Sequence, residues 1–208
     1  MPQTIICPPR KPFASGGPTG LLTLAFYISF LWPLTTGRVD AAFAGVLIPL
    51  GIIVAVIQIV SGIIELRNGH ILEGAIPLAF SCFMVLGAGE TALKLAGLMP
   101  MNSGPIDGHI MFVMGLLMTV LLFYVVREPF MVFLFYLANA CFFTPAGIGF
   151  LFDIPALQPI ANWFMLLVAI TAFWCAVAQM LETSFGRPVL WMGRPLVGTP
   201  SLPRNAAA

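Results

Sequence analysis

Long stretches of apolar sequence, almost free of charged residues, dominate this chain and restrict its fold. Five stretches, at residues 21–37, 41–64, 110–126, 129–152 and 154–181, contain no charged residue. A sixth, at residues 74–98, contains only Glu90 and Lys94. A membrane-spanning helix needs about 20 mostly apolar residues. The connections are short, so the sequence predicts an all-α integral membrane protein with six transmembrane helices and no soluble domain.

The composition supports a membrane protein. Of the 208 residues, 60% are hydrophobic and only 8% are charged, whereas soluble domains carry about 25% charged residues. So few charges could not cover the surface of a soluble fold, but a bilayer solvates apolar outer faces. The net charge of +1 creates no positive electrostatic field that would attract nucleic acid, so no nucleic-acid partner is expected. Membrane lipids are the expected surroundings.

The distribution of basic residues predicts the orientation. With six spans, seven basic residues share the side of the two termini: Arg10, Lys11, Arg67, Arg127, Arg187, Arg194 and Arg204. The opposite side has two, Arg38 and Lys94. Because basic residues favour the cytoplasmic side, we expect both termini in the cytoplasm and a multi-pass location in a cell inner membrane. The chain is therefore expected to consist of three parts: a cytoplasmic segment at residues 1–17, a transmembrane domain at 18–186 and a flexible cytoplasmic tail at 187–208.

No catalytic motif, metal-ligand spacing or cofactor motif occurs, so we expect neither an enzyme nor a bound cofactor or metal. The four cysteines are widely spaced. Cys82, Cys141 and Cys175 lie in apolar stretches and are expected to be buried structural thiols.

A few polar groups within the spans are candidates for a solute path. Gln58 and Asn139 either bond to neighbouring helices or line such a path. Glu90 and Lys94 are spaced to pair on one helix face, or Lys94 attracts anions in an outer vestibule. The glycine- and proline-rich segment 16–20 is an alternative anion site, because a following helix N-terminus would present N–H donors.

Three motifs resemble one known family. Gln58, Gly62, Glu65 and Gly69 match a Gln-x-x-x-Gly-x-x-Glu-x-x-x-Gly pattern. The segment 15–21 keeps the Pro, Gly and Leu of an Asn-Pro-x-Pro-Leu-Gly-Leu motif, and 185–193 is similar to a closing Phe-Gly-Arg-x-Val-Leu-Pro-x-Gly. These motifs, in this order across six spans, resemble the acetate uptake transporter family, also called the succinate–acetate permeases, of which the chain looks like a divergent member.

The resemblance implies a homo-hexamer with a pore in each protomer that passes acetate or similar small monocarboxylates together with protons. Carried over by position, the family's constriction falls on Leu24, Phe80 and Leu137, with Phe26 in place of Leu24 in a looser register. Pro18 and Gly20, at the entry of the first helix, are expected on the substrate path. Phe80 stands where the family has Tyr, and Leu24 where it has Phe. The helix-end motif Gly62, Glu65 and Gly69 completes the match, and Gln58, Asn139 and Lys94 complete the predicted path.

No convincing ionisable residue lies at mid-bilayer depth, and an unpaired carboxylate in an apolar site costs several kcal/mol. We therefore expect passage as, or with, the protonated acid. Two alternatives remain open. One is a urea or short-amide channel, which would also suit a pore of amides and aromatic rings. The other is an auxiliary membrane subunit that transports no solute.

Overall fold

The computed structural model describes residues 13–100 and 104–198. It contains six long helices: α1 (Gly17–Thr35), α2 (Leu47–Arg67), α3 (Ile71–Leu95), α4 (Gly104–Val125), α5 (Phe130–Leu151) and α6 (Gln158–Phe185). Two short 3₁₀ turns, η1 (Ala41–Val46) and η2 (Pro155–Leu157), precede α2 and α6. All six helices are long and apolar enough to cross a membrane. The prediction of six membrane-spanning helices is confirmed for the described residues.

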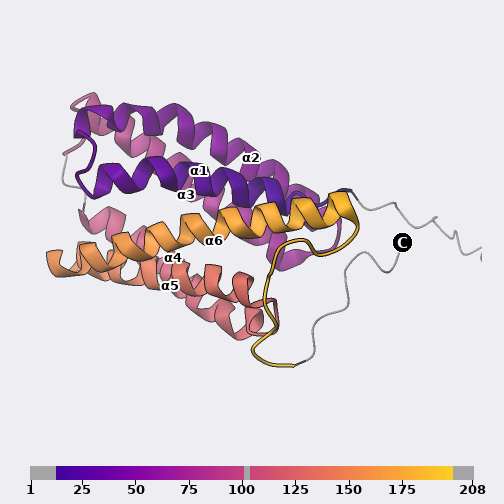
Figure 1. Cartoon of the computed structure of the whole chain (residues 1–208). Coiled ribbons are helices and arrows are strands. Elements are labelled where there is room, and N and C mark those ends of the chain that lie inside the picture. The colour runs from indigo at the N-terminus through magenta and orange to yellow at the C-terminus, as the bar shows by residue number, and fades with distance from the viewer. Residues whose placement is uncertain (1–12, 101–103, 199–208) are drawn as a thin grey trace, which may run out of the picture.

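The helices run alongside one another (Figure 1). Helix α1 packs between α2 and α6, α2 also packs on α3, and α5 packs between α4 and α6. The order of neighbours is therefore α3, α2, α1, α6, α5 and α4. The beginning of α1 and the end of α6 lie at the same end of the bundle, on the right in Figure 1. We call this the terminal end; the turns at residues 68–70 and 126–129 also belong to it.

The outward faces of the bundle are apolar. Phe123 of α4 is 84% exposed, and Ile71 of α3 and Trp163 of α6 are 71% and 63% exposed. Proteins in water rarely leave such large contiguous apolar surfaces uncovered. With six helices of membrane-spanning length, these faces make the chain a multi-pass membrane protein.

The helix ends follow from local chemistry. Helix α1 begins four residues before the apolar stretch 21–37, because Pro18 fits in the first turn, where its missing N–H costs no hydrogen bond. Helix α6 ends where Gly186 takes φ +65°, a left-handed conformation that glycine adopts without steric cost.

Residues 187–198 differ from the expected flexible tail 187–208. This segment, which we call the C-terminal strap, crosses back over the terminal end of the bundle (Figure 1). The backbone N of Met131 donates to Met192 O at 2.9 Å, and Trp174 Nε1 donates to Trp191 O, also at 2.9 Å. The Trp191 ring packs on Phe130 with 6.2 Å between centroids. Residues 199–208 of the expected tail, and residues 1–12 of the expected N-terminal segment, lie outside the described part of the chain.

The three described cysteines are free thiols with different environments. Cys175 is buried, Cys141 is half-buried and Cys82 is exposed. The expectation of burial is therefore correct for Cys175 and wrong for Cys82, which lies on the outward face of α3. An apolar stretch predicts a membrane environment for a thiol but does not say which face of the helix it occupies.

Candidate functional site

A cavity of about 1120 Å³ enters the bundle at its terminal end. All six helices and the strap contribute to its wall. The wall residues farthest from the terminal end on their helices mark where the cavity closes: Leu24, Gln58, Phe80, Leu121, Tyr136 and Cys175. The cavity therefore runs from the terminal end toward the middle of the bundle.

The structure brings many of the predicted residues together on this wall: Pro18, Gly20, Leu24, Gln58, Glu65 and Phe80 line the cavity. Leu137, Asn139, Lys94, Gly62 and Gly69 are not among its lining residues. The wall also includes strap residues from Pro188 to Arg194, which the sequence had placed in a flexible tail.

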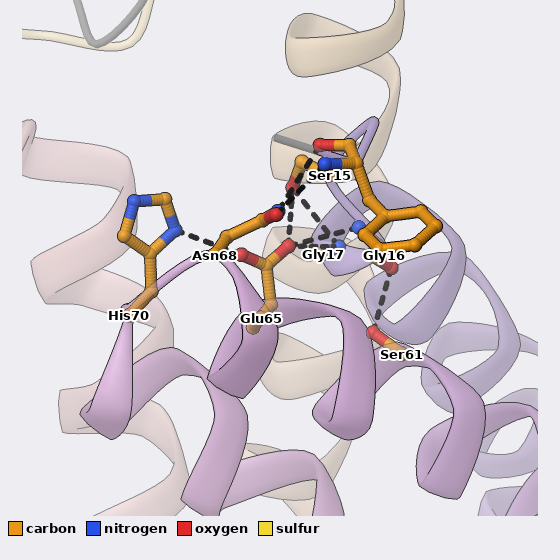
Figure 2. A network of polar contacts seen from close by, with 8 residues as sticks. Ser15, Gly16, Gly17, Ser61, Glu65, Asn68 and His70 are labelled. Atoms are coloured by element: carbon orange, nitrogen blue, oxygen red, sulfur yellow. Dashed lines mark hydrogen bonds and ion pairs between the residues drawn. The ribbon is translucent and has the colours of Figure 1, made fainter. Parts of the chain in front are cut away.

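The carboxylate of Glu65, at the end of α2, closes the N-terminus of α1. Its Oε1 accepts hydrogen bonds from Ser15 Oγ at 2.6 Å, from Gly16 N at 2.8 Å and from Gly17 N at 3.1 Å (Figure 2). The residue is 2% exposed. A negative charge at this position satisfies N–H groups that have no partner within the helix and interacts favourably with the helix dipole.

The sequence suggested that the α1 N-terminus could present donors to a solute anion. In the structure the anion at this place belongs to the protein. The other carboxylate oxygen, Oε2, lies 2.9 Å from His70 Nδ1, and Figure 2 shows both oxygens engaged at once. The Gly16 and Gly17 N–H groups are therefore already occupied by Glu65, an internal ligand from α2.

Further bonds hold α1 against α2. Ser61 Oγ donates to Gly16 O at 2.7 Å (Figure 2), and Gln58 Nε2 donates to Gly20 O at 2.9 Å. Gln58, Ser61 and Glu65 lie on one face of α2, spaced three and four residues apart. The amide of Gln58 thus bonds between helices and lies on the cavity wall, so the two readings left open by the sequence both apply to it.

The glycines of the helix-end motif have separate roles. A Cβ added to Gly62 would lie 2.8 Å from Gly74 O, so glycine here allows α2 and α3 to approach closely. Gly69 takes φ +86° in the turn between the two helices, which glycine adopts without strain. The motif therefore encodes a close helix crossing, a buried carboxylate and a turn.

A cluster of aromatic rings lies against the closed end of the cavity. Phe143 of α5 packs on Phe80 with 6.0 Å between ring centroids, on Phe83 at 5.4 Å and on Phe142 at 4.5 Å. Leu24, Phe80 and Phe143 are at most 3% exposed. We call this cluster the aromatic plug; it consists of Phe80, Phe83, Phe142 and Phe143. Phe143 was not among the predicted site residues, although the adjacent pair Phe142 and Phe143 within a predicted span was a visible signal.

Leu137, the predicted third member of the constriction, is half-buried. The α5 residues on the cavity wall are instead Val132, Phe135 and Tyr136. The structure thus brings Leu24 and Phe80 together at the closed end of the cavity and leaves Leu137 off its wall.

Asn139 occupies the α5 face between the cavity wall and the aromatic plug. Its side-chain Nδ2 donates to Phe135 O at 2.8 Å, and the residue is 1% exposed. Its Oδ1 is buried and accepts no hydrogen bond from the described residues. Buried polar atoms without a partner are uncommon in proteins and call for an explanation.

Formal negative charge predominates on the cavity wall. Its carboxylates belong to Glu65, Glu73, Glu128 and Glu182, and Arg194 is the fixed cation among the described wall residues. This wall does not resemble an anion-binding site, which would gather arginine and lysine.

Lys94 lies at the opposite end of the bundle between two carboxylates. Its Nζ is 3.6 Å from Glu90 Oε2 and 3.4 Å from Asp107 Oδ2. The three side chains are partly buried, at 19%, 15% and 24% exposed. The expected Glu90–Lys94 pair is present, and Asp107 of α4 makes it a cluster of formal charge −1. Lys94 therefore does not present a free positive charge to an approaching anion.

Within residues 13–100 and 104–198, no group of three or more His, Cys, Asp or Glu side chains is placed to hold a metal ion. No known family profile matches the sequence, and no curated protein sequence matches it. Among solved structures, the bacterial acetate channel SatP has a similar fold, with a TM-score of 0.79 at 20% sequence identity. The match covers 87% of this chain and 99% of the channel. The chain therefore shares the fold of a bacterial acetate channel, in agreement with the six-helix membrane fold predicted from the sequence.

Proposed function

We propose that this chain is a membrane channel or transporter that passes small monocarboxylic acids such as acetic acid, in protonated form, through each protomer. The observation that carries the proposal is the cavity, which enters an acetate-channel fold at the terminal end and closes at Leu24, Phe80 and the aromatic plug. The sequence motifs point to the same substrate class independently of the fold.

The charges along the path favour the neutral acid. A carboxylate anion would meet the four glutamates of the cavity wall and then a closed apolar segment at Leu24 and the plug. Leaving an ion unpaired in such a segment costs several kcal/mol, whereas a protonated acid carries only a dipole. A proton would accompany each acid molecule without a dedicated carboxylate relay.

We also propose an orientation in the membrane and an oligomeric state for the protein. The basic residues of the terminal end, among them Arg67, Arg127 and Arg187, favour a cytoplasmic position for that end in an inner membrane. The apolar outward faces offer surface for lipid and for neighbouring copies, and the family resemblance favours a homo-hexamer.

A short-amide or urea channel is the second candidate. It is favoured by the same wall, which lacks an anion-binding cluster, and by the unpaired Oδ1 of Asn139, which could accept from an amide N–H. The auxiliary-subunit alternative gains no such support, because a cavity lined by polar side chains from α2 to α6 fits a solute path better than a lipid-filled centre.

Radiolabelled acetate uptake into proteoliposomes, at two external pH values and with protein-free liposomes as background, tests the proposal. We expect saturable uptake that rises as the pH falls and is reduced by unlabelled propionate but not by urea. Uptake that is independent of pH would contradict passage of the neutral acid. Inhibition by urea and acetamide alone would favour the amide channel.

A further inference from the structure

The unpaired Oδ1 of Asn139 is buried on α5, between Phe135 of the cavity wall and Phe143 of the plug. Helices rise about 1.5 Å per residue, so Asn139 lies about 6 Å beyond the wall residue Phe135 and about 6 Å before Phe143. Its side chain points back toward Phe135, whose carbonyl accepts from Nδ2 at 2.8 Å. Along α5, Asn139 is therefore the first polar side chain beyond the cavity wall, and it precedes Phe143.

The chemistry of the available atom is defined. Because Nδ2 bonds to a carbonyl oxygen, the remaining atom is the amide oxygen, which can only accept hydrogen bonds. A buried acceptor without a partner lowers the stability of the folded protein. A passing solute that donates a hydrogen bond would relieve this cost while it occupies the site.

We propose that Asn139 Oδ1 accepts a hydrogen bond from the hydroxyl of the protonated acid, and that Asn139 thereby selects the neutral acid over its anion. A carboxylate has no donor, and its oxygens would face the partial negative charge of Oδ1. The protonated acid has one donor, which matches the one free acceptor. This assignment rests on the proposed function, and it makes Asn139 a specificity-determining residue of that path.

The test compares N139L with the unmodified protein in the acetate uptake assay. Leucine keeps the approximate volume and removes the acceptor. We expect uptake to fall about three- to tenfold, the loss that one neutral hydrogen bond would produce. We also expect the melting temperature of N139L to be equal or higher, because an apolar side chain removes an unpaired buried acceptor. A purely structural role would instead lower uptake and stability together.

Two further variants keep the result interpretable. N139D supplies a carbonyl acceptor when protonated, and should restore at least half of the uptake at the lower pH. Thr171→Val is the matched control: Thr171 is also 1% exposed, but its hydroxyl already donates to Leu167 O at 2.8 Å. We expect its uptake to stay within about twofold of the unmodified protein.

The outcomes separate this inference from the proposed function. Full uptake by N139L overturns the role of Asn139 and leaves the channel intact. A fall in N139L that is matched by Thr171→Val, or that accompanies a lower melting temperature, also overturns it. Absence of uptake through the unmodified, folded protein overturns the proposed function and this inference together.

Discussion

The carboxylate of Glu65 lies 2.8 Å from the backbone nitrogen of Gly16, so the end of α2 provides the counter-charge for the beginning of α1. The two residues are 49 positions apart in the chain. The Glu65 carboxylate of α2 therefore stabilises the start of α1, and the first turn of α1 is one wall of the cavity entrance. The stability of this contact and the shape of the entrance are linked.

Replacing Glu65 with glutamine should lower the free energy of unfolding by about 1–2 kcal/mol, because the helix-capping charge is lost while a weaker acceptor remains. Thermal unfolding in detergent measures the effect. E182Q is the control, since Glu182 lies on the same cavity wall but outside this network. Equal losses in the two variants would show that the Glu65 charge does not stabilise the α1 start.

The crossing of α2 and α3 gives a second stability prediction. Gly62→Ala would place a Cβ 2.8 Å from Gly74 O and 2.8 Å from Leu78 Cγ, so the helices must separate. We expect a loss of about 1–3 kcal/mol. Gly89→Ala is the matched control on α3, because a Cβ there meets nothing within 4 Å, and alanine favours a helix by up to about 1 kcal/mol. A Gly62→Ala protein as stable as Gly89→Ala would contradict the proposed reason for Gly62.

The helices could be predicted from the sequence because each depends on a local run of apolar residues. The face of α5 that points inward could not be predicted from the sequence, because this helix is apolar on all sides and shows no amphipathic stripe. Leu137 came from the family resemblance by position, whereas the structure places Phe135 on the wall and Phe143 in the plug.

The partners of the motif residues were also beyond sequence reasoning. The spacing identified Glu65, but its bonds to Ser15, Gly16 and Gly17 join segments about 50 residues apart. The strap was misjudged for a similar reason. Its proline and glycine content is typical of flexible segments, and its contacts to Trp174 become visible only after the helices are assembled.

The strap should loosen when its tertiary hydrogen bond is removed. Trp174→Phe keeps an aromatic ring but deletes the Nε1 donor to Trp191 O. We expect chymotrypsin to cleave after Trp191, which is 65% exposed, about three- to tenfold faster, as the loss of one such bond predicts. Trp163→Phe is the control, because Trp163 lies near the beginning of α6 and packs on Trp32 instead. Unchanged cleavage in Trp174→Phe would mean that other contacts hold the strap.

The charged cluster at the opposite end should affect stability more than transport. Lys94→Gln removes the cation that lies within 4 Å of Glu90 and Asp107, and we expect a loss of about 1–3 kcal/mol. Acetate uptake should stay within about twofold, because Lys94 lies off the cavity wall. Adding Asp107→Asn should recover part of the stability by relieving repulsion between the carboxylates. A large, salt-dependent fall in uptake would show instead that Lys94 attracts the anion.

The size limit of the path should depend on Leu24 and Phe143 and not on Leu137. Leu24→Ala and Phe143→Leu each remove buried volume at the closed end of the cavity. Because each methylene in an apolar pocket changes discrimination by about 10-fold or more, the ratio of propionate to acetate uptake should rise by about that factor.

Leu137→Ala is the comparison within α5. Its side chain is half-buried and lies off the cavity wall, so the ratio should stay within about twofold. All three proteins need a size-exclusion check, because truncating a core leucine costs about 2–5 kcal/mol. A larger change in Leu137→Ala than in Phe143→Leu would return the constriction to the position that the sequence resemblance implied.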